Sequence, residues 1–167
     1  MTEARTTGAE RPPLILIAGN PNSGKTTLFN ALTGSRARVG NYPGVTVDRR
    51  SGTLSLPGGR EVELVDVPGT YSLTARSPEE EVAIDAILGR GGHEADAVVV
   101  VADATTLGRG LYLATQILET RLPVVLALNM MDEAREAGVE IDVSVLAASL
   151  GVPVVPIVAS RGVPGGS

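Results

Sequence analysis

The sequence contains no cysteine and no tryptophan, and aromatic residues make up only 2% of its 167 residues. Without cysteine, disulfides, thiolate metal sites and cysteine nucleophiles are excluded. A core must therefore be built from aliphatic side chains, which is feasible because 43% of the chain is hydrophobic. The single histidine, His93, lies between a glycine and a glutamate, and we interpret it as a solvated loop residue rather than a metal ligand or a general base.

Long apolar runs and an excess of positive charge are also missing. The longest apolar runs, residues 97–102 and 124–128, have the length of strands, whereas a membrane-spanning helix needs about 18–20 apolar residues. Residues 1–13 are polar and lack the apolar core of a signal peptide, so we expect a disordered lead-in. The net charge of −5 argues against a nucleic-acid-binding surface. We expect a single soluble, cytoplasmic domain.

The most informative motif is a glycine-bounded loop with the spacing G-x-x-x-x-G-K-[ST]. It lies between an apolar run, residues 14–18, and a helical pattern, residues 25–32. Its residues are Gly19, Asn20, Pro21, Asn22, Ser23, Gly24, Lys25 and Thr26, and Thr27 follows. Glycine lets backbone N–H groups approach the β- and γ-phosphates, and the helix directs its positive end at them. Lys25 adds a charge and the Thr26 hydroxyl is placed to bind Mg²⁺, so the motif predicts a nucleoside triphosphate site rather than a plain glycine turn.

Predicted strands and helices alternate along the chain. Strands are expected at residues 14–18, 49–56, 60–65, 97–102, 123–128 and 154–158, and helices at 25–32, 78–88, 107–120 and 143–150. Because the interior strands are continuously apolar, we predict a three-layer α/β/α domain with a mostly parallel six-stranded sheet and one antiparallel strand. The nucleotide-binding domain would span residues 14–162, with 163–167 a truncated flexible tail. The glycine-rich segment 35–47 has no helical or strand period and reads as a functional loop.

Two short motifs follow predicted strands. In Asp66-x-x-Gly69, the carboxylate can hold Mg²⁺ through a water molecule and the glycine N–H can bind the γ-phosphate, although a turn gives the same pattern. In Asn129-x-x-Asp132, the Asp132 carboxylate can accept from N1–H and the 2-amino group of guanine. Adenine lacks that amino group, so this motif selects GTP over ATP unless it is only a helix cap.

Thr46 lies in the irregular segment before the predicted hairpin. It can reach Mg²⁺ and the γ-phosphate when GTP is bound and release them after hydrolysis, or it can simply begin a strand. Arg36 and Arg38 nearby are candidate phosphate contacts, but we interpret them as solvated charges.

Taken together, four strings resemble the N-terminal G domain of the FeoB family of bacterial ferrous iron transport proteins. They are Gly-Asn-Pro-Asn-Ser-Gly-Lys-Thr, Val-Gly-Asn-Tyr-Pro-Gly-Val-Thr-Val-Asp, Asp-Val-Pro-Gly-Thr-Tyr-Ser-Leu and Asn-Met-Met-Asp. The resemblance covers residues 14–162 and implies a Ras-like P-loop GTPase fold with slow GTP hydrolysis. It also implies that Gly44 and Val45 contact the nucleotide beside Thr46, and that Val158, Ala159 and Ser160 close over the guanine.

The sequence departs from the commoner small-GTPase pattern at two positions. Thr70 stands where many relatives have a water-orienting glutamine. The resemblance suggests that K⁺ acts instead, held by Asn22 and by main-chain carbonyls at Gly40 and Tyr42. Met130 stands where lysine is more usual, and it adds no ammonium group, so we expect modest nucleotide affinity.

The resemblance further implies that the intact protein lies at the cytoplasmic face of the bacterial inner membrane. Its helical and transmembrane domains would be the partners of this domain. Two rival functions stay open: a non-catalytic module that reports GTP or GDP occupancy to a partner, and an RNA-associated GTPase, which the acidic balance disfavours.

Overall fold

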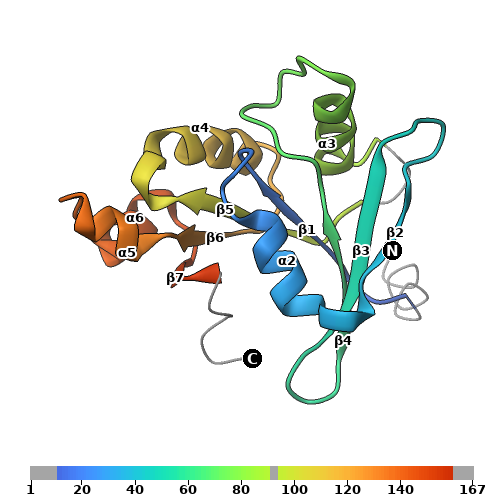
Figure 1. Cartoon of the computed structure of the whole chain (residues 1–167), viewed down its shortest axis with the longest axis horizontal. Coiled ribbons are helices and arrows are strands. Elements are labelled where there is room, and N and C mark those ends of the chain that lie inside the picture. The colour runs from blue at the N-terminus through green and yellow to red at the C-terminus, as the bar shows by residue number, and fades with distance from the viewer. Residues whose placement is uncertain (1–10, 91–93, 160–167) are drawn as a thin grey trace.

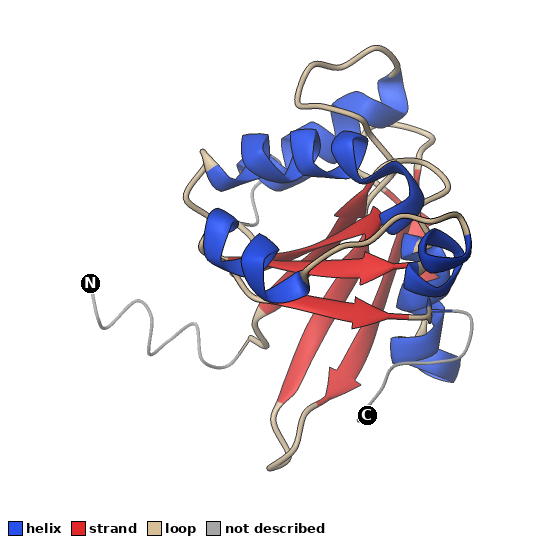
Figure 2. Ribbon diagram, turned by 90° about the vertical axis from the view of Figure 1, so that its left-hand side faces the viewer, coloured by secondary structure: helices blue, strands red, loops and turns tan. Residues whose placement is uncertain are grey.

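The computed structural model describes residues 11–90 and 94–159, which form a single seven-stranded sheet with helices on both faces (Figures 1 and 2). The strand order is β2-β3-β4-β1-β5-β6-β7. The strands are β1 (Leu14–Gly19), β2 (Arg38–Asn41), β3 (Asp48–Ser55), β4 (Glu61–Asp66), β5 (Ala97–Asp103), β6 (Val124–Asn129) and β7 (Val154–Ile157). The helices are α2 (Lys25–Thr33), α3 (Pro78–Leu88), α4 (Leu107–Leu118), α5 (Met131–Glu136) and α6 (Val143–Leu150), with short 3₁₀ turns at Gly34–Arg36 and Ala104–Thr106.

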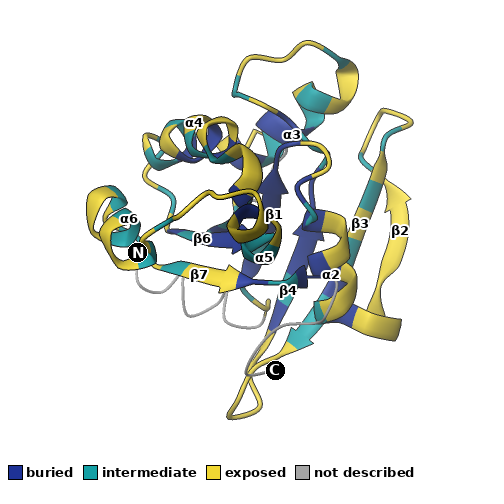
Figure 3. Ribbon diagram, turned by 60° about the vertical axis from the view of Figure 1, so that its left-hand side comes forward, coloured by how far each residue is buried: buried dark blue, intermediate teal, exposed yellow. Residues whose placement is uncertain are grey.

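Two apolar clusters, one on each face of the sheet, form the core. Leu16 and Val100 point to the face that α3 and α4 cover, whereas Ile17 and Val101 point to the face that α2 covers. The central strands are buried on both sides (Figure 3), which is why their sequences are apolar without alternation. The predicted three-layer α/β class is confirmed.

Local sequence signals account for several helix ends. Ser77 caps α3 by accepting a hydrogen bond from the Glu80 backbone N–H at 3.1 Å, and Gly89 ends the helix at φ 75°. Asp142 caps α6 by accepting from the Val145 N–H at 3.1 Å. Ser and Asp are favoured at N-caps, and only glycine adopts a left-handed C-terminal residue without steric cost. Both helices have the predicted bounds.

The sheet differs from the prediction in its strand count, which is seven rather than six. The additional strand is β2, inside the segment predicted to be irregular. All four β2 residues are exposed at the sheet edge, so no apolar alternation reveals the strand. Because β3 pairs antiparallel with both β2 and β4, it is the one strand that runs against the others, as predicted.

Smaller differences concern the helices. The helix expected at 107–120 ends at Leu118, and α5, which follows β6 directly, was not predicted because six residues carry no readable period. Within the ranges 11–90 and 94–159, no helix has the length and apolar character needed to cross a membrane. The predicted lead-in, the tail and His93 fall wholly or largely outside the described residues.

Candidate functional site

The glycine-bounded loop joins β1 to α2 at the carboxyl edge of the parallel strands, where ligands bind in open α/β sheets. The Ser23 N–H donates to the Asn20 carbonyl at 3.2 Å, which closes a turn inside the loop. Asn22 and Gly24 have φ angles of 66° and 96°. Asparagine and glycine are the residues that tolerate this left-handed region. The loop therefore curls back over the first turn of α2, as a phosphate-binding loop requires.

Glycine is required at both ends of the loop. A Cβ at Gly24 would lie 2.2 Å from Asn129 Nδ2, and one at Gly19 would lie 2.6 Å from the Val101 carbonyl oxygen. Real Cβ atoms do not approach other heavy atoms this closely, so either substitution would displace the loop from the neighbouring strand ends. The loop is packed against β5 and β6 rather than free to adjust.

Lys25, Thr26 and Asp66 meet at one point of this edge. Lys25 Nζ donates to Asp66 Oδ1 at 2.7 Å, and Thr26 Oγ1 donates to Asp66 Oδ2 at 2.9 Å. The Lys25 and Asp66 side chains are only 10% and 3% exposed. The carboxylate at the end of β4 thus orients both loop side chains, in an ion pair that solvent screens little.

Thr46 lines a cavity of about 360 Å³ together with Lys25, Thr26 and Asp66. The structure therefore brings together the three residues predicted to bind Mg²⁺, although Thr46 is 20 positions beyond Thr26 in the sequence. Hydroxyl and carboxylate oxygens are the ligands that Mg²⁺ prefers, so this donor set fits that ion. Asp48 and Glu79 line the same cavity. The sequence motifs did not identify these two, since neither belongs to a recognised spacing.

Hydrogen bonds join the backbone of Thr70, the residue after Gly69, to the phosphate-binding loop. The Thr70 N–H donates to the Gly19 carbonyl at 3.0 Å, and Asn20 Nδ2 donates to the Thr70 carbonyl at 3.0 Å. A Cβ at Gly69 would lie 3.0 Å from Pro21 Cα. Thr70 is completely buried, and its Oγ1 donates to the Ser72 carbonyl at 2.7 Å. Its hydroxyl is therefore engaged in holding the segment that follows Gly69.

Asn129 acts as a bridge between two loops. Its Nδ2 donates to the Ser23 carbonyl at 3.0 Å, and its Oδ1 accepts from the Ala159 N–H at 3.0 Å. Both polar atoms of this buried side chain are thus used within the protein. The geometry makes Asn129 a residue that positions the loops, which its spacing to Asp132 did not reveal.

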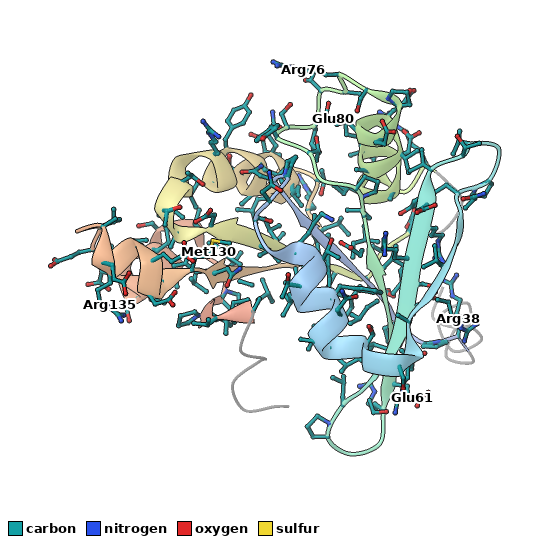
Figure 4. All side chains as sticks on the ribbon, viewed as in Figure 1. Arg38, Glu61, Arg76, Glu80, Met130 and Arg135 are labelled. Atoms are coloured by element: carbon teal, nitrogen blue, oxygen red, sulfur yellow. The ribbon has the colours of Figure 1, made fainter. Side chains whose placement is uncertain are left out.

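The remaining base-site predictions lie around this bridge. Met130 has φ 65° and precedes α5, and its Cε would lie 3.8 Å from a Cβ at Gly24, so its side chain reaches the phosphate-binding loop (Figure 4). Asp132 is in the first turn of α5. Val158 and Ala159 directly follow β7, whereas Ser160 is outside the described residues.

The segment that carries Gly40 and Tyr42 is held by its own hydrogen bonds. Gly40 is in β2, opposite Arg49. The Tyr42 N–H donates to the Val47 carbonyl at 3.0 Å, and the Tyr42 carbonyl accepts from the Val45 N–H at 3.3 Å. The phenol oxygen is buried and has no hydrogen-bond partner among the described residues. Burial raises the pKa of Tyr42 to about 12, although the nearby Arg49 charge opposes the shift.

Arg36 is not aimed at the phosphate-binding loop. Its Nη1 donates to Ser55 Oγ at 3.0 Å and lies 4.0 Å from a Glu61 carboxylate oxygen, at an exposed position. Gly44 has φ 80° and is exposed, and Val45 is 43% exposed; both are in the loop between β2 and β3 that also carries Thr46. Arg38 is exposed in β2.

A mostly parallel α/β sheet with these motifs at one edge defines a Ras-like P-loop GTPase fold. Comparison with known proteins narrows the class. The family model of ferrous iron transport protein B, in its N-terminal part, matches residues 14–164, and the chain belongs to this family.

Relatives and solved structures agree with this placement. The chain is 50% identical over 150 residues to the Fe(2+) transporter FeoB of Escherichia coli K12, covering 87% of this chain and 19% of the relative. The chain thus spans about a fifth of the length of such curated relatives. The crystal structure of the G domain of Thermotoga maritima FeoB covers 91% of both chains at 41% identity, with a TM-score of 0.82. The cytosolic domain of that protein in its GMPPNP form matches with a TM-score of 0.83 at 43% identity, covering 90% of this chain and 58% of that one.

Proposed function

We propose that this domain binds GTP, hydrolyses it slowly to GDP and phosphate, and thereby regulates ferrous iron uptake by a longer membrane protein. The observation that carries the proposal is the convergence of Lys25, Thr26, Thr46 and Asp66 on one cavity beside the phosphate-binding loop. The GMPPNP form of the related T. maritima domain supports it. The helical and transmembrane domains of the intact protein would receive the signal, at the cytoplasmic face of the bacterial inner membrane.

Each part of the site has a distinct role in this proposal. Backbone N–H groups of the loop and the start of α2 bind the β- and γ-phosphates, and Lys25 neutralises part of their charge. The oxygens of Thr26 and Thr46, with Asp66 acting through water, would hold Mg²⁺. When bound there, Mg²⁺ would supply positive charge to the phosphate oxygens. The Gly69 N–H would report whether the γ-phosphate is present, and Asp132 would select guanine.

K⁺ stimulation is a finer part of the same proposal. Asn22 is exposed, and its side chain forms no hydrogen bond with any described residue, so its amide oxygen is available to a cation. The Tyr42 carbonyl already accepts from the Val45 N–H at 3.3 Å, so K⁺ would share this oxygen with that hydrogen bond, through the second lone pair. A positive charge at Asn22 would lie close to the transferred phosphate and stabilise the charge that develops there.

A non-catalytic reporter of GTP or GDP is the second candidate function. Thr70 favours it, because its buried hydroxyl already donates to the Ser72 carbonyl and is not free to donate to a water molecule. Multiple-turnover phosphate release distinguishes an enzyme from such a reporter.

The test is phosphate release from GTP with Mg²⁺, in KCl and in NaCl at matched ionic strength, for the wild type and for Asn22→Ala. We expect faster turnover in KCl, and we expect Asn22→Ala to lose that advantage. Equal rates in both salts would refute the role of K⁺ and leave a slow GTPase. GTP binding without turnover in either salt would refute catalysis and favour the reporter.

A further inference from the structure

A groove of about 500 Å³ lies between the segment after Thr70 and the start of α4, separate from the nucleotide site. Tyr71, Arg76 and Glu80 line one side, and Arg109 and Tyr112 line the other. We call it the tyrosine–arginine groove. Figure 4 shows Arg76 and Glu80 at the same end of the molecule.

The composition of this groove is unusual for the chain. The whole sequence has three tyrosines, one phenylalanine and no tryptophan. Two of these four aromatic residues, Tyr71 and Tyr112, are in the groove, and they are 45% and 57% exposed. Phe29 is buried in the core, whereas neither of these two rings is, so core packing does not explain them. Tyrosine and arginine are the residues enriched where proteins bind other proteins.

The charges in the groove favour an anionic partner. Neither Arg76 nor Arg109 forms an ion pair within the described part of the chain. The Glu80 carboxylate is already engaged, since it accepts from the Arg76 backbone N–H at 2.7 Å and lies 3.5 Å from Thr70 Oγ1. Two guanidinium groups are therefore free to bind carboxylates, on a protein whose net charge is −5.

Hydrogen bonds connect the groove to the phosphate-binding loop. Thr70 bonds to Gly19 and Asn20 through its backbone and to Ser72 through its hydroxyl. Across the groove, the Leu73 N–H donates to Gln116 Oε1 at 2.7 Å, and Gln116 Nε2 donates to Tyr112 Oη at 3.3 Å. The two sides of the groove are therefore linked to each other and, through Thr70, to the phosphate-binding loop.

We propose that the tyrosine–arginine groove binds a protein segment in which carboxylates flank an apolar side chain, with an affinity that depends on the bound nucleotide. The apolar side chain packs between the tyrosine rings, and the carboxylates bind Arg76 and Arg109. The nucleotide dependence rests on the proposed function above, whereas the binding surface does not.

The test uses two short capped peptides of leucine, serine and glutamate or lysine, identical except that lysine replaces every glutamate in the second. Each is titrated into the ¹⁵N-labelled full chain loaded with GDP or with GMPPNP, and nucleotide loading is measured on the same samples. The variants are Arg76→Ala/Arg109→Ala, the charge reversal Arg76→Glu/Arg109→Glu, and the control Arg60→Ala/Arg135→Ala. The control removes two arginines that also lack an ion pair among the described residues and that lie elsewhere, Arg60 directly before β4 and Arg135 in α5.

We expect the glutamate peptide to bind about tenfold more tightly than the lysine peptide, with shifts confined to Tyr71–Arg76 and Gly108–Tyr112. The alanine pair should lose that preference, the control should keep it, and the charge reversal should prefer lysine. Three results would refute the proposed binding surface. They are equal affinities for both peptides, no binding of either up to millimolar concentrations, and no effect of the charge reversal. Binding that is the same with GDP and GMPPNP, on samples shown to be loaded, would overturn the nucleotide dependence. Failure to load nucleotide would instead refute the proposed function.

Discussion

The role of Asn129 gives the sharpest test of the site. Its side chain is 3% exposed, and it bridges the Ser23 carbonyl and the Ala159 N–H, both at 3.0 Å. Asn129→Ala would leave these two backbone groups without partners. A buried unsatisfied group costs about 1–3 kcal/mol, so the substitution should lower the free energy of unfolding by roughly 2–6 kcal/mol. That is a large part of the about 5–15 kcal/mol typical of a whole domain.

The assay is urea unfolding without nucleotide, followed by guanine-nucleotide binding at a urea concentration where each variant is folded. Asn30→Ala is the matched control, because Asn30 is exposed in α2 and its side chain forms no hydrogen bond with the described residues. It should change the free energy of unfolding by less than about 0.5 kcal/mol. Asn129→Asp should also destabilise, since it keeps the acceptor for Ala159 but places an oxygen against the Ser23 carbonyl. If Asn129→Ala unfolds within about 0.5 kcal/mol of the wild type, the bridging role is refuted.

Three further predictions use the same assay or the turnover assay. Ser23→Ala removes a buried hydroxyl with no partner among the described residues, so we expect the free energy of unfolding to rise by about 1 kcal/mol, and a decrease would contradict this. Because burial raises the pKa of Tyr42 from 10.0 to about 12, the folded state retains that proton longer. The wild type should therefore lose part of its free energy of unfolding as the pH rises from 10 toward 12, and Tyr42→Phe should not show this loss. Identical pH profiles for the two proteins would contradict the burial of the phenol. Gly69→Ala places a Cβ 3.0 Å from Pro21, so we expect GTP turnover to fall about tenfold or more while GDP affinity changes little; unchanged turnover would contradict a role for this contact.

The fold was largely predictable because its strong signals are local. Apolar runs such as β5 and β6 are buried on both faces and can be read without alternation. The bounds of α3 and α6 follow from caps at Ser77 and Asp142. The strand β2 was missed because its four residues are exposed and it depends on pairing with β3, which is a tertiary property.

The sequence predicted which residues lie at the candidate site better than it predicted which contacts they make. Parallel strands place their carboxyl ends at one edge, so Asp66 and Asn129 were expected near the phosphate-binding loop, and both are there. Thr46 lines the same cavity, although the path of the loop that carries it has no periodic signal. No sequence motif indicated that Asp48 and Glu79 also line this cavity.

The contacts that organise the site join residues far apart in the chain. Asn129 reaches across 106 positions to Ser23, Asp66 across 41 to Lys25, and Thr70 across 50 to Asn20. No spacing rule describes such pairs, because each depends on how the sheet is assembled. All three fasten a loop at the carboxyl edge to the phosphate-binding loop, so that loop cannot shift without disturbing β4, β6 or the segment that leads to the tyrosine–arginine groove. A change at the phosphates therefore has a defined path to the surface: it passes through Thr70, whose backbone holds the loop and whose hydroxyl holds the groove.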